Sequence, residues 1–165
     1  MSARQDAEFR EFMHARWPAM VRLAYGLTGD QGHAEDVAQA AFARAYASWP
    51  RVRRSGDPDA YVRQIVINEN RNRFRKHRVA EHVTDRVPEH SGADCAQALG
   101  ERSALMAALR TLGPRQRAVV VLRFWLDLTE AETAAALGCS VGTVKSQASR
   151  ALLRLRAELV EAGLR

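Results

Sequence analysis

Residues 130–147 carry small and apolar side chains at the positions that two short helices need in order to cross at a tight turn. Ala134 supplies the small side chain at the crossing, and Gly138 tolerates the positive φ angle that such a turn requires. Apolar contacts from the second helix to the first are expected from Leu137, Val141 and Val144. The pattern predicts a helix-turn-helix, although by itself it also fits a plain pair of antiparallel helices.

The outward side of the second of these helices carries side chains that can hydrogen-bond to base edges or to phosphates in a major groove. They are Thr143, Lys145, Ser146, Gln147, Ser149 and Arg150. The formal net charge of the chain is +6, which points to an anionic partner. The charge and this face together favour a DNA-binding helix over a simple helical hairpin.

The rest of the chain is also predicted to be helical, because apolar residues recur at spacings of three and four. Pro18 should kink or split the first helix, and residues 50–57 should form a loop. Asp57, Thr129 and Ser140 are expected to cap helix N-termini. The expected helices span about residues 6–27, 34–49, 58–78, 101–111, 114–125, 130–137 and 141–159.

The distribution of charge divides the chain into two domains. Residues 51–78 hold nine Lys and Arg against three acids, whereas residues 79–101 hold five acids and a single Arg86. The second of these stretches has no apolar period, so it is predicted to be a flexible linker. We therefore expect an all-α fold of two small helical domains, residues 1–78 and 101–165, joined by a flexible linker at residues 79–100.

The expected helix at residues 34–49 has two unlike faces. Its buried stripe is predicted to contain Val37, Ala38, Ala41, Phe42, Ala45, Tyr46 and Trp49. On the other side, Asp36, Gln39, Ala40 and Ala43 leave a short, neutral-to-acidic surface with no Lys or Arg before Arg44. Such a surface fits a docking site, and it fits a bare alanine-rich helix equally well.

Several stretches resemble the conserved regions of sigma factors, the promoter-recognition subunits of bacterial RNA polymerase. Region 2 is resembled by residues 34–39 (AEDVAQ), 42–46 (FARAY) and 61–68 (YVRQIVIN) with its basic tail. Region 4 is resembled by residues 112–117 (LGPRQR), 121–124 (VLRF), 128–132 (LTEAE) and 137–146 (LGCSVGTVKS). The order of the motifs and the short linker resemble the extracytoplasmic-function (ECF) group, which keeps only these two regions. The Arg- and Ala-rich composition is similar to actinobacterial SigE-like members.

The resemblance implies a role for each candidate residue. Core RNA polymerase would bind through its flap and through the clamp of its largest subunit, the latter at Glu35, Asp36, Gln39, Ala40 and Ala43. In the downstream (−10) promoter element, a flipped base would be held by Val52, Arg53 and Arg54, and exposed bases would be read by Asn68 and Asn72. Phosphates of that element would be held by Arg71, Arg73, Arg75 and Lys76. The upstream (−35) element would be read by Thr143, Lys145, Ser146, Gln147, Ser149 and Arg150.

Other functions have less support in the sequence. No nucleophile with a partner base, glycine-rich phosphate loop or metal-ligand spacing is present, so we expect no enzyme activity, cofactor, metal or small-molecule substrate. No stretch approaches the length of a membrane span, and we expect a cytoplasmic protein. Cys139 and the three tryptophans (Trp17, Trp49 and Trp125) are expected in the core, and Cys95 in the linker.

Two alternatives stay open at this point. A stand-alone helix-turn-helix regulator would bind duplex operators without polymerase. A small RNA-binding protein would explain only the basic run at residues 71–78, and it would bind RNA without sequence preference. Residues 161–165 leave no room for an appended regulatory domain, so control is expected from a separate anti-sigma factor, from transcription of the gene or from proteolysis.

Overall fold

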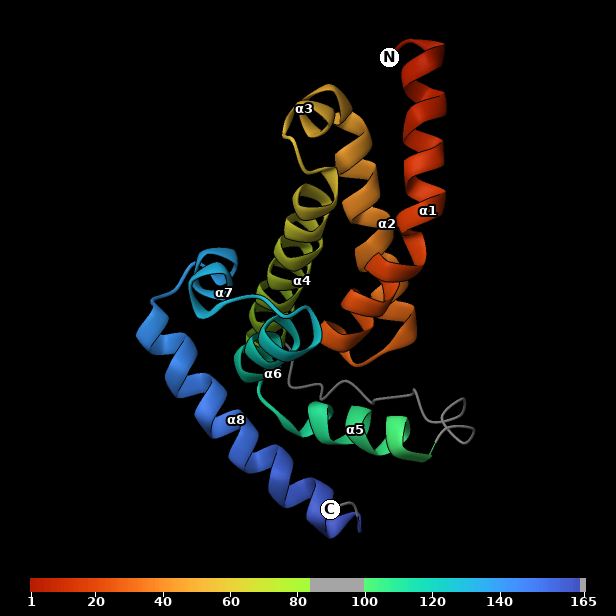
Figure 1. Cartoon of the computed structure of the whole chain (residues 1–165). Helices are drawn as coiled ribbons and strands as arrows, with labels where there is room; N and C mark the ends of the chain where they lie inside the picture. The colour runs from red at the N-terminus through yellow and green to blue at the C-terminus, as the bar shows by residue number, and fades with distance from the viewer. Residues whose placement is uncertain (84–99, 164–165) are drawn as a thin grey trace. The chain divides into compact units, whose positions relative to one another are not determined.

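The computed structural model of the 165-residue chain describes residues 1–83 and 100–163, and every regular element within these ranges is helical (Figure 1). The chain separates into two compact units, Met1–Val87 and Pro88–Arg165. The predicted all-α fold is therefore confirmed. The predicted linker at residues 79–100, with Cys95, lies mostly outside the described residues.

The first unit begins with α1 (Ala3–Thr28), which is capped at both ends. The Ser2 hydroxyl accepts a hydrogen bond from the backbone N–H of Gln5 at 3.3 Å, and Gly29 closes the helix with a φ of 73°. Pro18 was expected to kink or split this segment, and the split does not occur. α1 runs through Pro18 as one helix, with Phe9 before it and Met20 after it both buried.

Helix α2 (Gln31–Ala47) begins earlier than expected, because Asp30 caps it. The Asp30 carboxylate accepts the backbone N–H of His33 at 2.8 Å, and this hydrogen bond is the main reason that the pKa of Asp30 is lowered. The inner face of α2 consists largely of fully buried alanines, which let α1 and α4 (Pro58–Val83) pack closely on either side: Ala34, Ala38, Ala41 and Ala45.

The segment expected to be a loop contains a helix, α3 (Trp49–Arg54), so the loop prediction was wrong. Pro50 occupies a first-turn position, where its missing N–H removes no hydrogen bond. Trp49 is 3% exposed and Val52 is fully buried, so this single turn is held by packing. Asp57 then caps α4 as predicted, accepting the backbone N–H of Ala60 at 3.0 Å. The helix extends past the expected end at Arg78 to Val83.

The second unit contains α5 (Gly100–Thr111), α6 (Pro114–Val120), the π-helix η1 (Val121–Trp125), α7 (Glu130–Leu137) and α8 (Val141–Glu161). The single helix expected at residues 114–125 therefore widens into a π turn, in which the Leu126 N–H donates to the Val121 carbonyl at 3.0 Å. Val121 and Leu122 are buried, but Trp125 is 42% exposed. The expectation that Trp125 belongs to the core was wrong, because the π turn carries it past the buried stripe.

Candidate nucleic-acid interface

Helices α7 and α8 form the predicted helix-turn-helix. The Thr129 hydroxyl and the Glu132 carboxylate form a reciprocal capping box at the start of α7. Gly138 ends that helix with a φ of 65°, and the Ser140 hydroxyl then accepts the Thr143 N–H at 3.1 Å to start α8. Where the helices cross, Ala134 and fully buried Val144 meet in one core cluster, and Cys139 packs against it half-buried.

The outer face of α8 presents the predicted side chains in two groups. Four of them are exposed: Lys145, Ser146, Ser149 and Arg150. Thr143 and Gln147 are half-buried, and the Thr143 hydroxyl lies 2.9 Å from that of Ser140, so it serves the N-cap. Lys145 Nζ lies 3.7 Å from Glu130 Oε2, whereas within residues 1–83 and 100–163 Arg150 has no ion pair. Of the two cations on this face, Arg150 is therefore the one without an ion pair among the described residues.

The expected −10 reading residues lie along α4. Asn68 is exposed and its side-chain oxygen accepts a hydrogen bond from Gln64 Nε2 at 3.1 Å, while Asn72, one turn on, is half-buried. The cations of the basic run differ in exposure in the same way: Arg71, Arg75 and Lys76 are exposed and Arg73 is half-buried. The two asparagines therefore differ in how readily a base can reach them.

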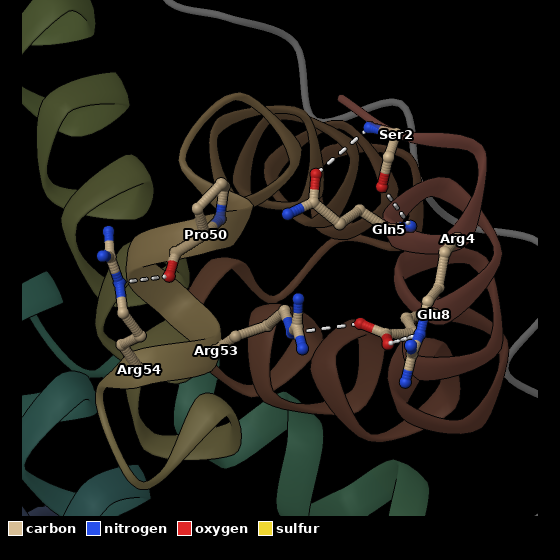
Figure 2. A network of polar contacts seen from close by, with 7 residues as sticks. All are labelled: Ser2, Arg4, Gln5, Glu8, Pro50, Arg53 and Arg54. Atoms are coloured by element: carbon tan, nitrogen blue, oxygen red, sulfur yellow. Dashed lines mark hydrogen bonds and ion pairs between the residues drawn. The ribbon is translucent and has the colours of Figure 1, made fainter.

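Arg53 and Arg54 extend from α3 in different directions, as Figure 2 shows. Arg53 Nε lies 3.0 Å from the Glu8 carboxylate of α1, which Arg4 also approaches at 3.4 Å, and Arg54 Nε donates to the Pro50 carbonyl at 3.0 Å. Val52 lies in the core beneath them and is 0% exposed. Val52 was expected to contact a flipped base, but no atom of its side chain reaches the surface, so it cannot make that contact in this structure.

The outer face of α2 is open, as its pattern predicts. Glu35, Asp36, Gln39 and Ala43 are exposed and Ala40 is partly exposed. Tyr46, expected in the buried stripe, is instead 44% exposed, because its ring packs edge-on against Phe9 while its hydroxyl reaches Asp6 on the surface.

One pair of residues next to these surfaces was missed by sequence reasoning. Arg44 of α2 forms an ion pair with Glu69 of α4, and both line a cavity that also contains Asn72 and Arg73. The sequence did contain a hint of this pair. Arg44 is the single cation beside the outer face of α2, and Glu69 is an isolated acid ahead of the basic run. Their pairing could not be found without the packing of α2 on α4.

Other kinds of site were sought in the part of the chain that the structure describes. Within it no three His, Cys, Asp or Glu side chains gather to hold a metal ion. None of the described helices is long and apolar enough to cross a membrane.

Comparison with known proteins agrees with this geometry. Residues 13–79 match the family model described as Sigma-70 region 2, and residues 102–155 match Sigma-70, region 4. The RNA polymerase sigma-E factor of Streptomyces coelicolor is 42% identical over 93% of this chain and 86% of that protein. The ECF RNA polymerase sigma factor SigL of Mycobacterium tuberculosis is 29% identical over 99% of this chain and 95% of that protein.

Among solved structures, the sigma factor RpoE of Bartonella quintana, in complex with the anti-sigma factor NepR, matches with a TM-score of 0.71. The two chains are 26% identical, and the match covers 92% of this chain and 96% of the RpoE chain. Two helical units bearing regions 2 and 4 define a bacterial sigma factor. The chain belongs to the ECF sigma factors, and it is similar to the sigma-E factors of Streptomyces. It is a non-enzymatic protein that binds RNA polymerase and directs transcription initiation.

Proposed function

We propose that α8 reads the −35 element in the major groove, α3 and α4 bind the −10 element, and the outer face of α2 docks on the clamp of the polymerase largest subunit. The observation that carries this proposal is the position of α8. Fully buried Val144 fixes one side of the helix to α7, and the opposite side leaves Lys145, Ser149 and Arg150 exposed. This is the arrangement of a recognition helix.

For the −10 element we propose that different residues of the first unit bind the bases and the phosphates. Asn68 and Asn72 read unstacked bases, since amides can donate to and accept from base edges. Arg53 and Arg54 on α3 hold the flipped base, and the cations Arg71, Arg73, Arg75 and Lys76 hold phosphates. Arg53 is already paired with Glu8, so it must exchange that partner for DNA.

For polymerase, we propose that the clamp covers Glu35, Asp36, Gln39, Ala40 and Ala43. Short side chains let a partner helix approach closely, and Asp36 offers a charge with no ion pair among the described residues. We further propose that region 4 contacts the polymerase flap, that the protein works in the cytoplasm, and that an anti-sigma factor binds it, since the similar RpoE structure is a complex with the anti-sigma factor NepR. The domain limits 1–78 and 101–165, with a linker at residues 79–100, are part of the same proposal.

In vitro transcription with core polymerase on a genomic library of promoter fragments tests the whole proposal. Transcripts should start downstream of one shared pair of elements, and Arg150→Ala and Asn68→Ala should each reduce their yield. Arg22→Ala, an exposed cation on α1 away from the proposed surfaces, serves as the control. Equal yields from all three variants would contradict the assignment of α4 and α8 to promoter DNA.

A further inference from the structure

A cavity of about 420 Å³ lies between α2 and α4 in the first unit. It is lined by Arg44 of α2 and by Glu69, Asn72, Arg73, Arg75 and Lys76 of α4. Four of these six side chains are cations and one is an acid. A concave surface with such an excess of positive charge attracts an anion more strongly than the same charges spread over a flat face.

Glu69 engages one edge of the Arg44 guanidinium. The Arg44 Nε lies 2.5 Å from Glu69 Oε1, and the Glu69 side chain is only 14% exposed whereas that of Arg44 is 66% exposed. With Nε held by the carboxylate, the terminal Nη groups remain as donors. A guanidinium presents these donors as a rigid fork that matches two oxygens of a phosphate.

Arg73 points to the same kind of ligand. Its Nη1 is buried and has no hydrogen-bond partner in the part of the chain that the structure describes. A buried donor on a charged group is costly to leave unsatisfied, so such a group normally has an acceptor in the functional state. An anion in the cavity that Arg73 lines would supply that acceptor.

We propose that this α2–α4 pocket binds one backbone phosphate of the promoter DNA, with Arg44 and Arg73 as its ligands and Glu69 as the residue that positions Arg44. The inference rests on the proposed function, in which Asn72 on the pocket wall reads the −10 element. It adds to that function a DNA ligand from α2, the helix whose outer face is assigned to polymerase. Docking and phosphate binding then share one rigid element.

The test measures holoenzyme binding to fork-junction promoter DNA in which single −10 phosphates are replaced by neutral methylphosphonates. At one position the replacement should weaken wild-type binding by about tenfold or more, as expected for the loss of a charge-assisted hydrogen bond. At that position Arg44→Ala holoenzyme should show no further loss, because its ligand is already absent. Arg44→Lys keeps the positive charge but loses the paired Nη donors, so its holoenzyme should retain part of the sensitivity to the methylphosphonate at that position. This variant also controls for the chance that Arg44→Ala misfolds.

Arg16→Ala is the matched control. Arg16 Nε lies 2.9 Å from Asp59 Oδ1, so this pair also ties α4 to a neighbouring helix, but Arg16 does not line the pocket. Its variant should keep the full position-specific sensitivity. Identical methylphosphonate profiles for wild type and for both Arg44 variants would overturn the proposal, and so would a loss of sensitivity in Arg16→Ala equal to that in Arg44→Ala.

Glu69→Gln separates positioning from simple charge. Removing the carboxylate makes the pocket more positive. If Glu69 acted through its charge alone, the variant holoenzyme should bind the DNA more tightly with an unchanged methylphosphonate profile, and that result would contradict the positioning role. If Glu69 positions Arg44, the methylphosphonate at the one critical phosphate should weaken binding less in the variant than in wild type. Asn68→Ala is measured alongside: if its opening defect persists while the pocket variants behave as wild type, only the pocket proposal fails. If Asn68→Ala also opens promoters normally, the assignment of α4 to the −10 element fails as well.

Discussion

The hydroxyl of Tyr46 donates a hydrogen bond to the Asp6 carboxylate at 3.0 Å and so joins the last turns of α2 to the first turn of α1. The hydrogen bond to Asp6, followed by the negative charge of that residue, raises the pKa of Tyr46 above its usual value of 10.0. The contact lies at the surface beside the aromatic rings of Phe9 and Trp49, which form the core underneath it.

This contact predicts a stability difference at high pH. Because the folded-state pKa of Tyr46 is raised, its contribution is fully present below pH 10 and is lost as the pH rises through the folded-state value. Wild type should therefore lose more stability than Tyr46→Phe as the pH rises from below 10 through the folded-state value. Urea unfolding across that range checks the difference, and in an absorbance titration Tyr46→Phe should lose the step that belongs to Tyr46. Asp6→Asn should lower that step, and an unchanged titration would refute the assigned cause.

The docking face predicts a separation of binding from folding. Asp36→Arg places a cation in an exposed surface without opening a cavity, so the circular dichroism spectrum should stay native while holoenzyme assembly fails. Co-purification with core polymerase measures assembly. Glu11→Arg makes the same charge change on the exposed side of α1 and should assemble normally. Wild-type yield of holoenzyme from Asp36→Arg would show that this face is bare surface.

The two proposed DNA-binding surfaces, on α4 and on α8, should respond to different DNA. Arg150→Ala should weaken binding to duplex −35 DNA by roughly 1–3 kcal/mol if the side chain contacts a base bidentately. Asn68→Ala should leave that binding intact and impair strand opening, which permanganate reports by modifying unpaired thymines. If instead Asn68→Ala opens promoters as wild type does, α4 does not read the melted strand.

The capping box of α7 should contribute measurably to the second unit. Thr129→Ala removes the acceptor for the Glu132 N–H, which lies 3.1 Å from the hydroxyl oxygen, and should lower the free energy of unfolding by about 0.5–2 kcal/mol. Thr129→Ser keeps the hydroxyl and should be close to wild type in thermal denaturation of a region 4 fragment. A loss in both variants would place the effect in the threonine methyl group.

Local chemistry was the predictable part of this fold. Asp57, Thr129, Ser140 and Gly138 each fulfil a role that depends on the next few residues, and each does so in the structure. The errors came from packing between elements. α3 is helical because Trp49 and Val52 are buried, and the same burial removes Val52 from the surface where a loop would have left it.

The candidate site was predictable to the same extent. Its polar side chains could be assigned to helix faces by periodicity, and Lys145, Ser149 and Arg150 are exposed as that assignment requires. Contacts between distant residues could not be assigned in this way, because no local pattern encodes a partner. The pair of Arg44 with Glu69 and that of Arg53 with Glu8 belong to this class.

The alanine-lined inner face of α2 has a mechanical consequence. Ala34, Ala38, Ala41 and Ala45 are all 0% exposed, and side chains that end at the β-carbon have no rotamers with which to yield. A close-packed interior of this kind has low compressibility and transmits strain. A push on the outer face of α2 should therefore be passed on to α1 and α4. In the proposed function, a partner seated on that face would then shift Asn68 and Asn72 relative to the −10 DNA.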